Sequence, residues 1–126
     1  MAVPLELKFT RDHYWIRLNG ETAVIGFTEQ GIANFGMILF VELPVPGTEL
    51  QQGEYWGTAE TAEDELDLWS PLTGKVIQTN LWLEKTTMPI YESPYDKGYL
   101  FSIACSRKDE FEGLLTAEEY EAAYPQ

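Results

Sequence analysis

The alternation of apolar and polar residues predicts that this chain is built mainly from short strands. Residues 14–18 and 22–27 are strand-like on either side of Asn19-Gly20, a dipeptide that tolerates the positive φ of a two-residue turn. Residues 57–61 and 65–68 alternate in the same way around a polar tip at residues 62–64. A period of two is typical of a strand with one buried face. The pattern therefore predicts two hairpins, the second of which holds an acidic tip out into water.

Three further apolar segments predict additional strands. Residues 38–43 are the most apolar run and predict a central strand, while residues 75–78 and 99–103 predict two later strands. Between the later two, residues 81–85 are compatible with a helical turn. Pro89 and Pro94 predict irregular structure in the rest of that segment, because proline lacks the backbone N–H that regular structure uses.

Two short helices are predicted by their start signals. Thr28 can cap a helix that ends near Gly36, and Thr116 with Glu119 forms a capping box that begins a C-terminal helix. Closely spaced strands with small helices at the margins indicate a compact β barrel or sandwich with helical decoration.

Composition limits the classes of function. The chain has 126 residues, 44% of them hydrophobic, which predicts one domain over residues 1–126. Its formal net charge of -13 argues against binding to nucleic acid and to anionic membranes. A lone cysteine, Cys105, excludes an internal disulfide, and no apolar run is long enough to cross a bilayer. We therefore expect a cytoplasmic protein.

The order and spacing of several motifs resemble one family along nearly the whole chain. The motifs are Lys8-Phe9-Thr10 with His13, Trp15 and Arg17; Gly26-Phe27-Thr28-Glu29; Phe40-Val41-Glu42-Leu43-Pro44 with Gly47; Glu60, Asp67, Pro71 and Gly74; Asn80, Pro94-Tyr95 and Gly98; and Leu114-Leu115 with Tyr120. Together they resemble the H protein of the glycine cleavage system. The resemblance implies a mainly β, lipoyl/biotinyl-carrier-like barrel-sandwich hybrid with short helices, including a C-terminal helix.

The resemblance also implies where the function of the family resides. Family members carry lipoate on one lysine at the tip of a hairpin, after a Glu-Ser-Val-like triplet. The matching segment here is Glu60-Thr61-Ala62-Glu63, so Glu63 occupies the lysine position. A carboxylate cannot form the amide that lipoylation requires, because the reaction needs an amine nucleophile. We therefore expect no cofactor, although lipoate is expected for the family. Lys75, Lys85 and Lys97 lack the hairpin context and are not expected to replace it.

Other departures from the family pattern cluster around the expected arm cleft. Met37 stands where the family usually has Asp, and residues 91–93 and 96–99 also differ. Large aromatic residues appear at Trp56, Trp69 and Trp82. These substitutions suggest that the cleft is filled or reshaped, because no arm needs shelter.

The acidic hairpin is the main candidate site. Five carboxylates, Glu60, Glu63, Asp64, Glu65 and Asp67, lie within eight residues. A metal site is not expected, because the calcium-loop pattern is absent and a strand pair sends alternate side chains to opposite faces. A solvated acidic tip is the simplest interpretation, and a docking patch for a basic partner is the functional alternative. Trp56 and Trp82 are added as candidate exposed partner contacts.

No catalytic set is evident. His13, the lone histidine, is expected to be structural or interfacial, and Cys105 is expected to be a buried, inert thiol. The side chains of Tyr14, Trp15, Phe35, Phe40, Trp69 and Phe101 are expected in the core or at its edge. Without an acid, base and nucleophile that converge, an enzyme is not predicted.

Three functional hypotheses remain. The first is an H-protein-like domain that cannot be lipoylated and acts as a non-catalytic binding or regulatory module, with glycine-cleavage or lipoate-transfer enzymes as candidate protein partners. The second is a working lipoyl carrier for glycine decarboxylation that uses an unrecognised lysine. The third is a small-molecule binder that uses the former arm cleft.

Overall fold

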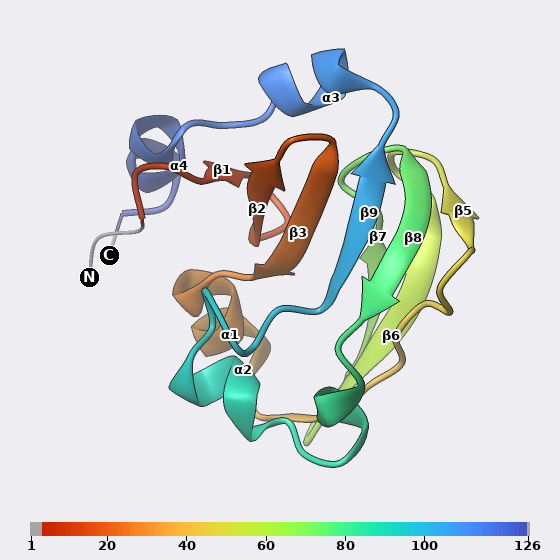
Figure 1. The fold of residues 1–126 in the computed structure, drawn as a ribbon. Coiled ribbons are helices and arrows are strands. Elements are labelled where there is room, and N and C mark those ends of the chain that lie inside the picture. Colours follow the sequence, from red (N-terminus) through yellow and green to blue (C-terminus); the bar gives the residue numbers. More distant parts are fainter. Residues whose placement is uncertain (1–3, 126) are drawn as a thin grey trace.

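Two antiparallel sheets form the body of the molecule (Figure 1). The structure is a computed structural model and describes residues 4–125. Six strands form one sheet in the order β1-β2-β3-β9-β8-β5, and three form the other in the order β4-β6-β7. The strands are β1 (Lys8–Phe9), β2 (Tyr14–Asn19), β3 (Thr22–Phe27), β4 (Ile38–Val41), β5 (Glu49–Leu50), β6 (Tyr55–Thr61), β7 (Glu65–Trp69), β8 (Gly74–Thr79) and β9 (Phe101–Cys105).

Short helices cover the ends of the sheets. They are α1 (Glu29–Phe35), the 3-10 helix η1 (Leu81–Glu84), α2 (Met88–Glu92), α3 (Lys108–Glu112) and α4 (Ala117–Ala123). Figure 1 shows α1 and α2 together at one end of the sheets, α3 at the opposite end and α4 beside β1. This arrangement confirms the mainly β barrel-sandwich fold with short helices, including the C-terminal one. No helix within residues 4–125 has the length and apolar character needed to span a membrane.

The start signals read from the sequence form as expected. In the first hairpin Asn19 pairs with Thr22, and Gly20 takes a φ of 67° in the turn. The Thr28 hydroxyl accepts a hydrogen bond from the Gly31 N–H at 3.0 Å and so caps α1. The capping box of Thr116 and Glu119 begins α4 with both of its reciprocal hydrogen bonds present.

The main core lies between the two sheets. It contains the buried side chains of Ile25, Phe27 and Ile103 from the larger sheet and of Leu68 from the smaller one. A second apolar cluster joins the C-terminal helix to the first strands, where the rings of Phe9 and Tyr120 stack with centroids 4.8 Å apart. The second cluster therefore attaches α4 to the six-stranded sheet.

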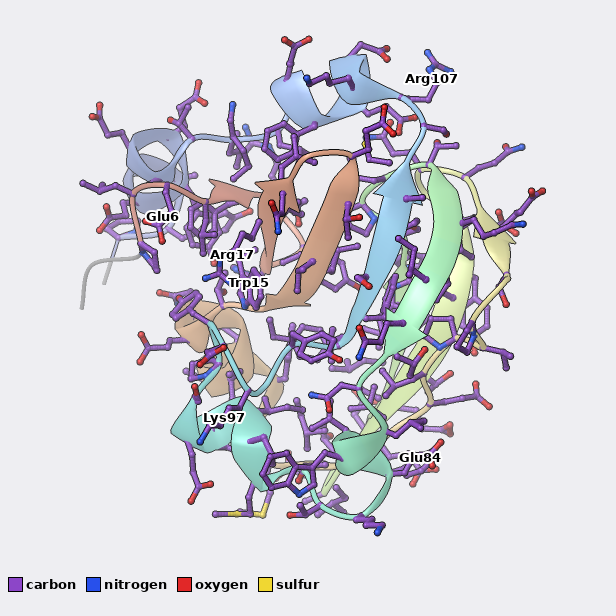
Figure 2. All side chains as sticks on the ribbon, viewed as in Figure 1. Glu6, Trp15, Arg17, Glu84, Lys97 and Arg107 are labelled. Atoms are coloured by element: carbon purple, nitrogen blue, oxygen red, sulfur yellow. The ribbon has the colours of Figure 1, made fainter. Side chains whose placement is uncertain are left out.

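The segment at residues 94–95 is fixed to β2 by polar contacts. The Trp15 indole donates to the Pro94 carbonyl at 2.8 Å, and the Arg17 guanidinium donates to the Tyr95 carbonyl at 3.0 Å. Arg17 also lies over the Trp15 ring, 5.1 Å from its centroid, and Figure 2 shows the two side chains next to each other. These contacts fix the end of the α2 segment against the larger sheet.

Two sequence-based expectations about elements are wrong. The apolar run at 38–43 forms an edge strand, because β4 pairs only with β6. Leu39 and Phe40 are exposed, and only Ile38 and Val41 of this strand reach the core. Pro89 does not keep its segment irregular, because it lies in the first turn of α2, where the missing N–H has no helical partner.

Candidate functional site

The tip of the β6–β7 hairpin is a closed turn. The Thr61 N–H donates to the Asp64 carbonyl at 2.8 Å, and the Thr61 hydroxyl donates to the same carbonyl at 3.1 Å. The Asp64 N–H returns a hydrogen bond to the Thr61 hydroxyl at 3.0 Å. Ala62 contacts the α1–β4 connection through a hydrogen bond to the Met37 carbonyl at 3.3 Å. The turn therefore holds Ala62 and Glu63 out into solvent, as the sequence pattern predicts.

The five hairpin carboxylates are all exposed but do not converge. Glu60, Glu65 and Asp67 project from the strands, with Glu60 directly opposite Glu65, while Glu63 and Asp64 lie at the tip. Within residues 4–125, no three acidic, histidine or cysteine side chains gather as metal ligands would. The arrangement is an acidic surface in which like charges repel one another.

The two tryptophans proposed as partner contacts have different environments. Trp56 is only 6% exposed, so its assignment as an exposed contact is wrong. Its ring packs edge-on against Phe101 and its indole donates to the Tyr14 hydroxyl at 3.2 Å. A register shift between Tyr55 and Gly57 accompanies this inward orientation. Trp82 on η1 is 55% exposed and remains a candidate contact.

Phe40 and Trp69, expected in the core or at its edge, are exposed instead. The expectation is wrong because both side chains lie on the solvent face of the three-stranded sheet. The signal for Trp69 was present in the sequence, since it follows Asp67 at the period of two that places both on one face. Tyr55, which stacks edge-on against Trp69 with centroids 5.9 Å apart, was missed as a surface residue.

Open depressions border the hairpin tip. One of about 210 Å³ lies between Ala62-Glu63 and the end of α1. It shares Ala33, Gly36 and Met37 with a neighbouring depression of about 430 Å³ that reaches Tyr91. Bulky side chains therefore do not fill this space, and the alternative that the cleft is reshaped stays a prediction. Trp56 faces the core, and Met37 is largely exposed beside the depression.

His13 packs against the C-terminal segment of the chain. Its Nδ1 lies 2.7 Å from the Tyr120 hydroxyl, and its ring packs edge-on against Tyr124 with centroids 4.6 Å apart. Burial lowers the pKa of His13, and the nearby Asp12 carboxylate opposes that effect. The neutral imidazole is therefore favoured, and its hydrogen-bond partner is a tyrosine of the C-terminal helix.

The Cys105 thiol is half-buried, which corrects the expectation that it is buried. It lies near the end of β9, with Sγ 3.6 Å from the Arg107 carbonyl. Burial raises its pKa, and the carboxylates of Glu110 and Asp109 add to the effect. A raised pKa leaves less thiolate at neutral pH, so this thiol is poorly suited to nucleophilic work.

The two sheets, the projecting hairpin and the short peripheral helices define a protein of the lipoyl-carrier fold. Comparison with known proteins narrows the class. The family model for the glycine cleavage H-protein matches residues 7–126. The chain is 38% identical over 120 residues to the glycine cleavage system H protein of Staphylococcus saprophyticus and 37% identical to that of Staphylococcus haemolyticus, and each match covers 95% of both chains. The chain therefore belongs to the glycine cleavage H-protein family.

A solved structure agrees with this assignment. The crystal structure of a glycine cleavage system H protein from Mycobacterium marinum superposes with a TM-score of 0.89 at 28% sequence identity. The match covers 98% of this chain and 100% of that one. Proteins of this family are carriers and not catalysts, which agrees with the expectation that the chain is not an enzyme. The family acts together with glycine-cleavage enzymes, which agrees with the expected use of protein partners.

Proposed function

We propose that this protein is an H-protein-family member that cannot be lipoylated and that it acts as a non-catalytic binding or regulatory module. The observation that carries the proposal is the residue at the centre of the hairpin tip. Glu63 stands at the position that matches the lipoyl-lysine of the family, and its side chain is a carboxylate. Formation of a lipoyl amide requires an amine that attacks an activated acyl group, and a carboxylate cannot perform that step.

The hairpin tip keeps a well-formed shape, so the proposed obstacle to lipoylation is the functional group of residue 63. The tip is closed by the hydrogen bonds between Thr61 and Asp64, and Glu63 lies exposed between them. A transfer enzyme would therefore meet a well-formed hairpin that offers the wrong functional group. Partners of the module, on this proposal, are glycine-cleavage or lipoate-transfer enzymes that recognise the shape of the domain without loading it.

No other lysine considered from the sequence lies in an equivalent position. Lys75 is in the body of β8, opposite Glu49 of β5. Lys85 follows η1, and Lys97 lies in the turn after α2, exposed in Figure 2. None of these three is at the tip of a hairpin. This argues against a working carrier that uses Lys75, Lys85 or Lys97.

Intact-mass measurement tests the proposal directly. The protein is co-expressed with a lipoate ligase in medium that contains free lipoate, and the expected result is an unmodified mass. Glu63→Lys is expected to gain one lipoyl group, because the change restores the amine at the tip. Glu63→Gln is the matched control, since it removes the same charge without supplying an amine, and it is expected to stay unmodified. A lipoyl mass on the unaltered protein would overturn the proposal in favour of the carrier alternative.

A small-molecule role remains as a second candidate, supported by the open depressions that share Ala33, Gly36 and Met37. Their lining includes apolar groups that an aliphatic ligand could cover. A nuclear magnetic resonance titration of the isotopically labelled protein with free lipoamide tests this role. Chemical-shift changes confined to the residues around Met37 would support ligand binding there, and unchanged spectra at millimolar lipoamide would exclude it.

A further inference from the structure

The outward face of the three-stranded sheet combines exposed aromatic rings with carboxylates. Its residues, which we call the outer sheet face, are Phe40 of β4, Tyr55 and Glu60 of β6, and Glu65, Asp67 and Trp69 of β7. Phe40, Tyr55 and Trp69 are 46%, 45% and 45% exposed. The strand register places the residues in adjacent rows, with Phe40 opposite Glu60, Glu60 opposite Glu65, and Tyr55 opposite Trp69.

This combination is unfavourable for the isolated domain. Glu60 and Glu65 are directly opposed on one face, and like charges in that geometry repel each other. The three aromatic rings leave a large part of their apolar surface in water, where it contributes nothing to the core. Both costs would be relieved by a partner that brings cations and apolar contact to the same face.

The strands of this sheet carry no positive charge of their own. Residues 18–74, which include all three strands of this sheet, contain ten acidic residues and no lysine, arginine or histidine. Within residues 4–125 the one ion pair joins Arg107 and Asp109, at the start of α3 and away from this sheet. Arg11 borders the face from the β1–β2 connection, where it lines a depression with Asp67 and Trp69, but it forms no ion pair within residues 4–125. The outer sheet face therefore carries a net negative charge.

We propose that the outer sheet face is a docking surface for a protein partner that presents arginine side chains. A guanidinium can stack on an aromatic ring and at the same time donate paired hydrogen bonds to a carboxylate, which an ammonium cannot do as well. The face offers this combination twice. Phe40 lies directly opposite Glu60, and Trp69 lies two residues from Asp67 on the same side of β7.

Charge excludes the other simple occupants. A second copy of the chain would bring another net charge of -13 to an acidic surface. A nucleic acid would bring phosphates. The proposal deepens the partner-binding role proposed above and rests on it. It concerns a different surface, because the aromatic residues lie along β4, β6 and β7 and not at the hairpin tip.

The test is a nuclear magnetic resonance titration of the whole protein with a nonapeptide of arginine and, separately, with a nonapeptide of lysine. We expect shifts at the indole of Trp69 and at the amides of Phe40 and Glu60, with the arginine peptide binding more tightly. Trp69→Ala and the double variant Glu60→Gln/Glu65→Gln are each expected to weaken its binding about fivefold.

Matched controls remove equivalent groups elsewhere. Leu5→Ala deletes an exposed apolar side chain before β1 of the other sheet, and Glu112→Gln/Glu118→Gln removes two exposed charges from α3 and α4. Both controls are expected to change the affinity less than about twofold, since distant exposed charges are screened by salt.

Three outcomes would overturn the proposal. They are equal binding of the two peptides with equal loss in the control variants, shifts that map to another surface, and concentration-dependent dimerisation that broadens the signals of Trp69. The intact-mass measurement described above tests the proposed function independently of this titration. A protein that becomes lipoylated yet binds the arginine peptide at this face contradicts the proposed function at the tip and leaves the identity of the docking face intact.

Discussion

The Tyr120 hydroxyl connects three parts of the fold, and its removal makes a sharp test of how the C-terminal helix is held. It lies 2.7 Å from His13 Nδ1 and 2.8 Å from the Thr28 hydroxyl, and the side chain is fully buried. Thr28 in turn accepts from the Gly31 N–H as the cap of α1. With His13 neutral and protonated on Nε2, Tyr120 donates to Nδ1 and accepts from Thr28.

We predict that Tyr120→Phe lowers the free energy of unfolding by about 2 kcal/mol. The ring and its stacking on Phe9 are kept, so the change removes two hydrogen bonds worth about 1 kcal/mol each. For a domain of this size that loss lowers Tm by roughly 6–10 °C. Burial raises the pKa of Tyr120 to about 12, so the hydroxyl keeps its proton throughout the working range of the assay.

The assay is urea unfolding followed by circular dichroism, with an unchanged slope as the check that the unfolded state is unaltered. Tyr124→Phe is the matched control, because the Tyr124 hydroxyl makes one exposed hydrogen bond to the Arg11 carbonyl at 3.2 Å. The control should lose less than about 0.5 kcal/mol. Equal stability of Tyr120→Phe and the unaltered protein would refute the reasoning, since it would mean that the buried hydroxyl contributes nothing.

Three further predictions concern other parts of the molecule. Because burial lowers the pKa of His13, the unfolded state binds more protons than the folded state, so the free energy of unfolding should fall as pH drops below about 6.5. In urea unfolding between pH 5 and 7, His13→Asn should flatten that dependence, and asparagine tolerates the φ of 70° at this position. Gly57→Ala should lower the free energy of unfolding by about 1–3 kcal/mol, because a Cβ there would collide with the Glu42 carbonyl oxygen. In the control Gly113→Ala the nearest atoms lie 3.6 Å from the new Cβ, so stability should hardly change, and equal losses of stability for the two variants in thermal unfolding would contradict this. Cys105 should react with a disulfide reagent more slowly than free cysteine at pH 8 and reach the free rate in denaturant, because burial raises its pKa, and a native rate equal to the free rate would contradict this.

Local signals in the sequence predicted the elements that local chemistry determines. The alternation around residues 62–64 predicted the β6–β7 hairpin, and the hydroxyls of Thr28 and Thr116 predicted the starts of two helices. The pairing of strands in the sheets could not be predicted from such local signals. The apolar run of β4 suggested a central strand, but β4 pairs with β6 alone and exposes Leu39 and Phe40. The number of neighbours that a strand has depends on contacts distant in sequence, which local alternation does not encode.

The candidate site was predicted in position but not in detail. Exposure of Glu63 follows from the hairpin pattern alone, and the family resemblance supplied the meaning of that position. The burial of Trp56 depends on a register shift beside Gly57, and single-sequence alternation cannot reveal a bulge. The rows of Phe40, Glu60 and Glu65 likewise depend on which strands become neighbours.

The tip and the outer sheet face can be separated by experiment because the tip is closed without help from Glu63. Within residues 4–125 its side chain makes no hydrogen bond, and the turn depends on Thr61 and Asp64. Glu63→Lys should therefore leave both the turn and the outer sheet face unchanged. If that variant is still not lipoylated, the acidic neighbours that a ligase meets are the next obstacle to test. Adding Asp64→Asn and Glu65→Gln removes both charges, keeps a side-chain oxygen at residue 64 that accepts from the backbone N–H of residue 65, and should then restore modification. Failure of the triple variant would mean that recognition depends on surfaces beyond the hairpin.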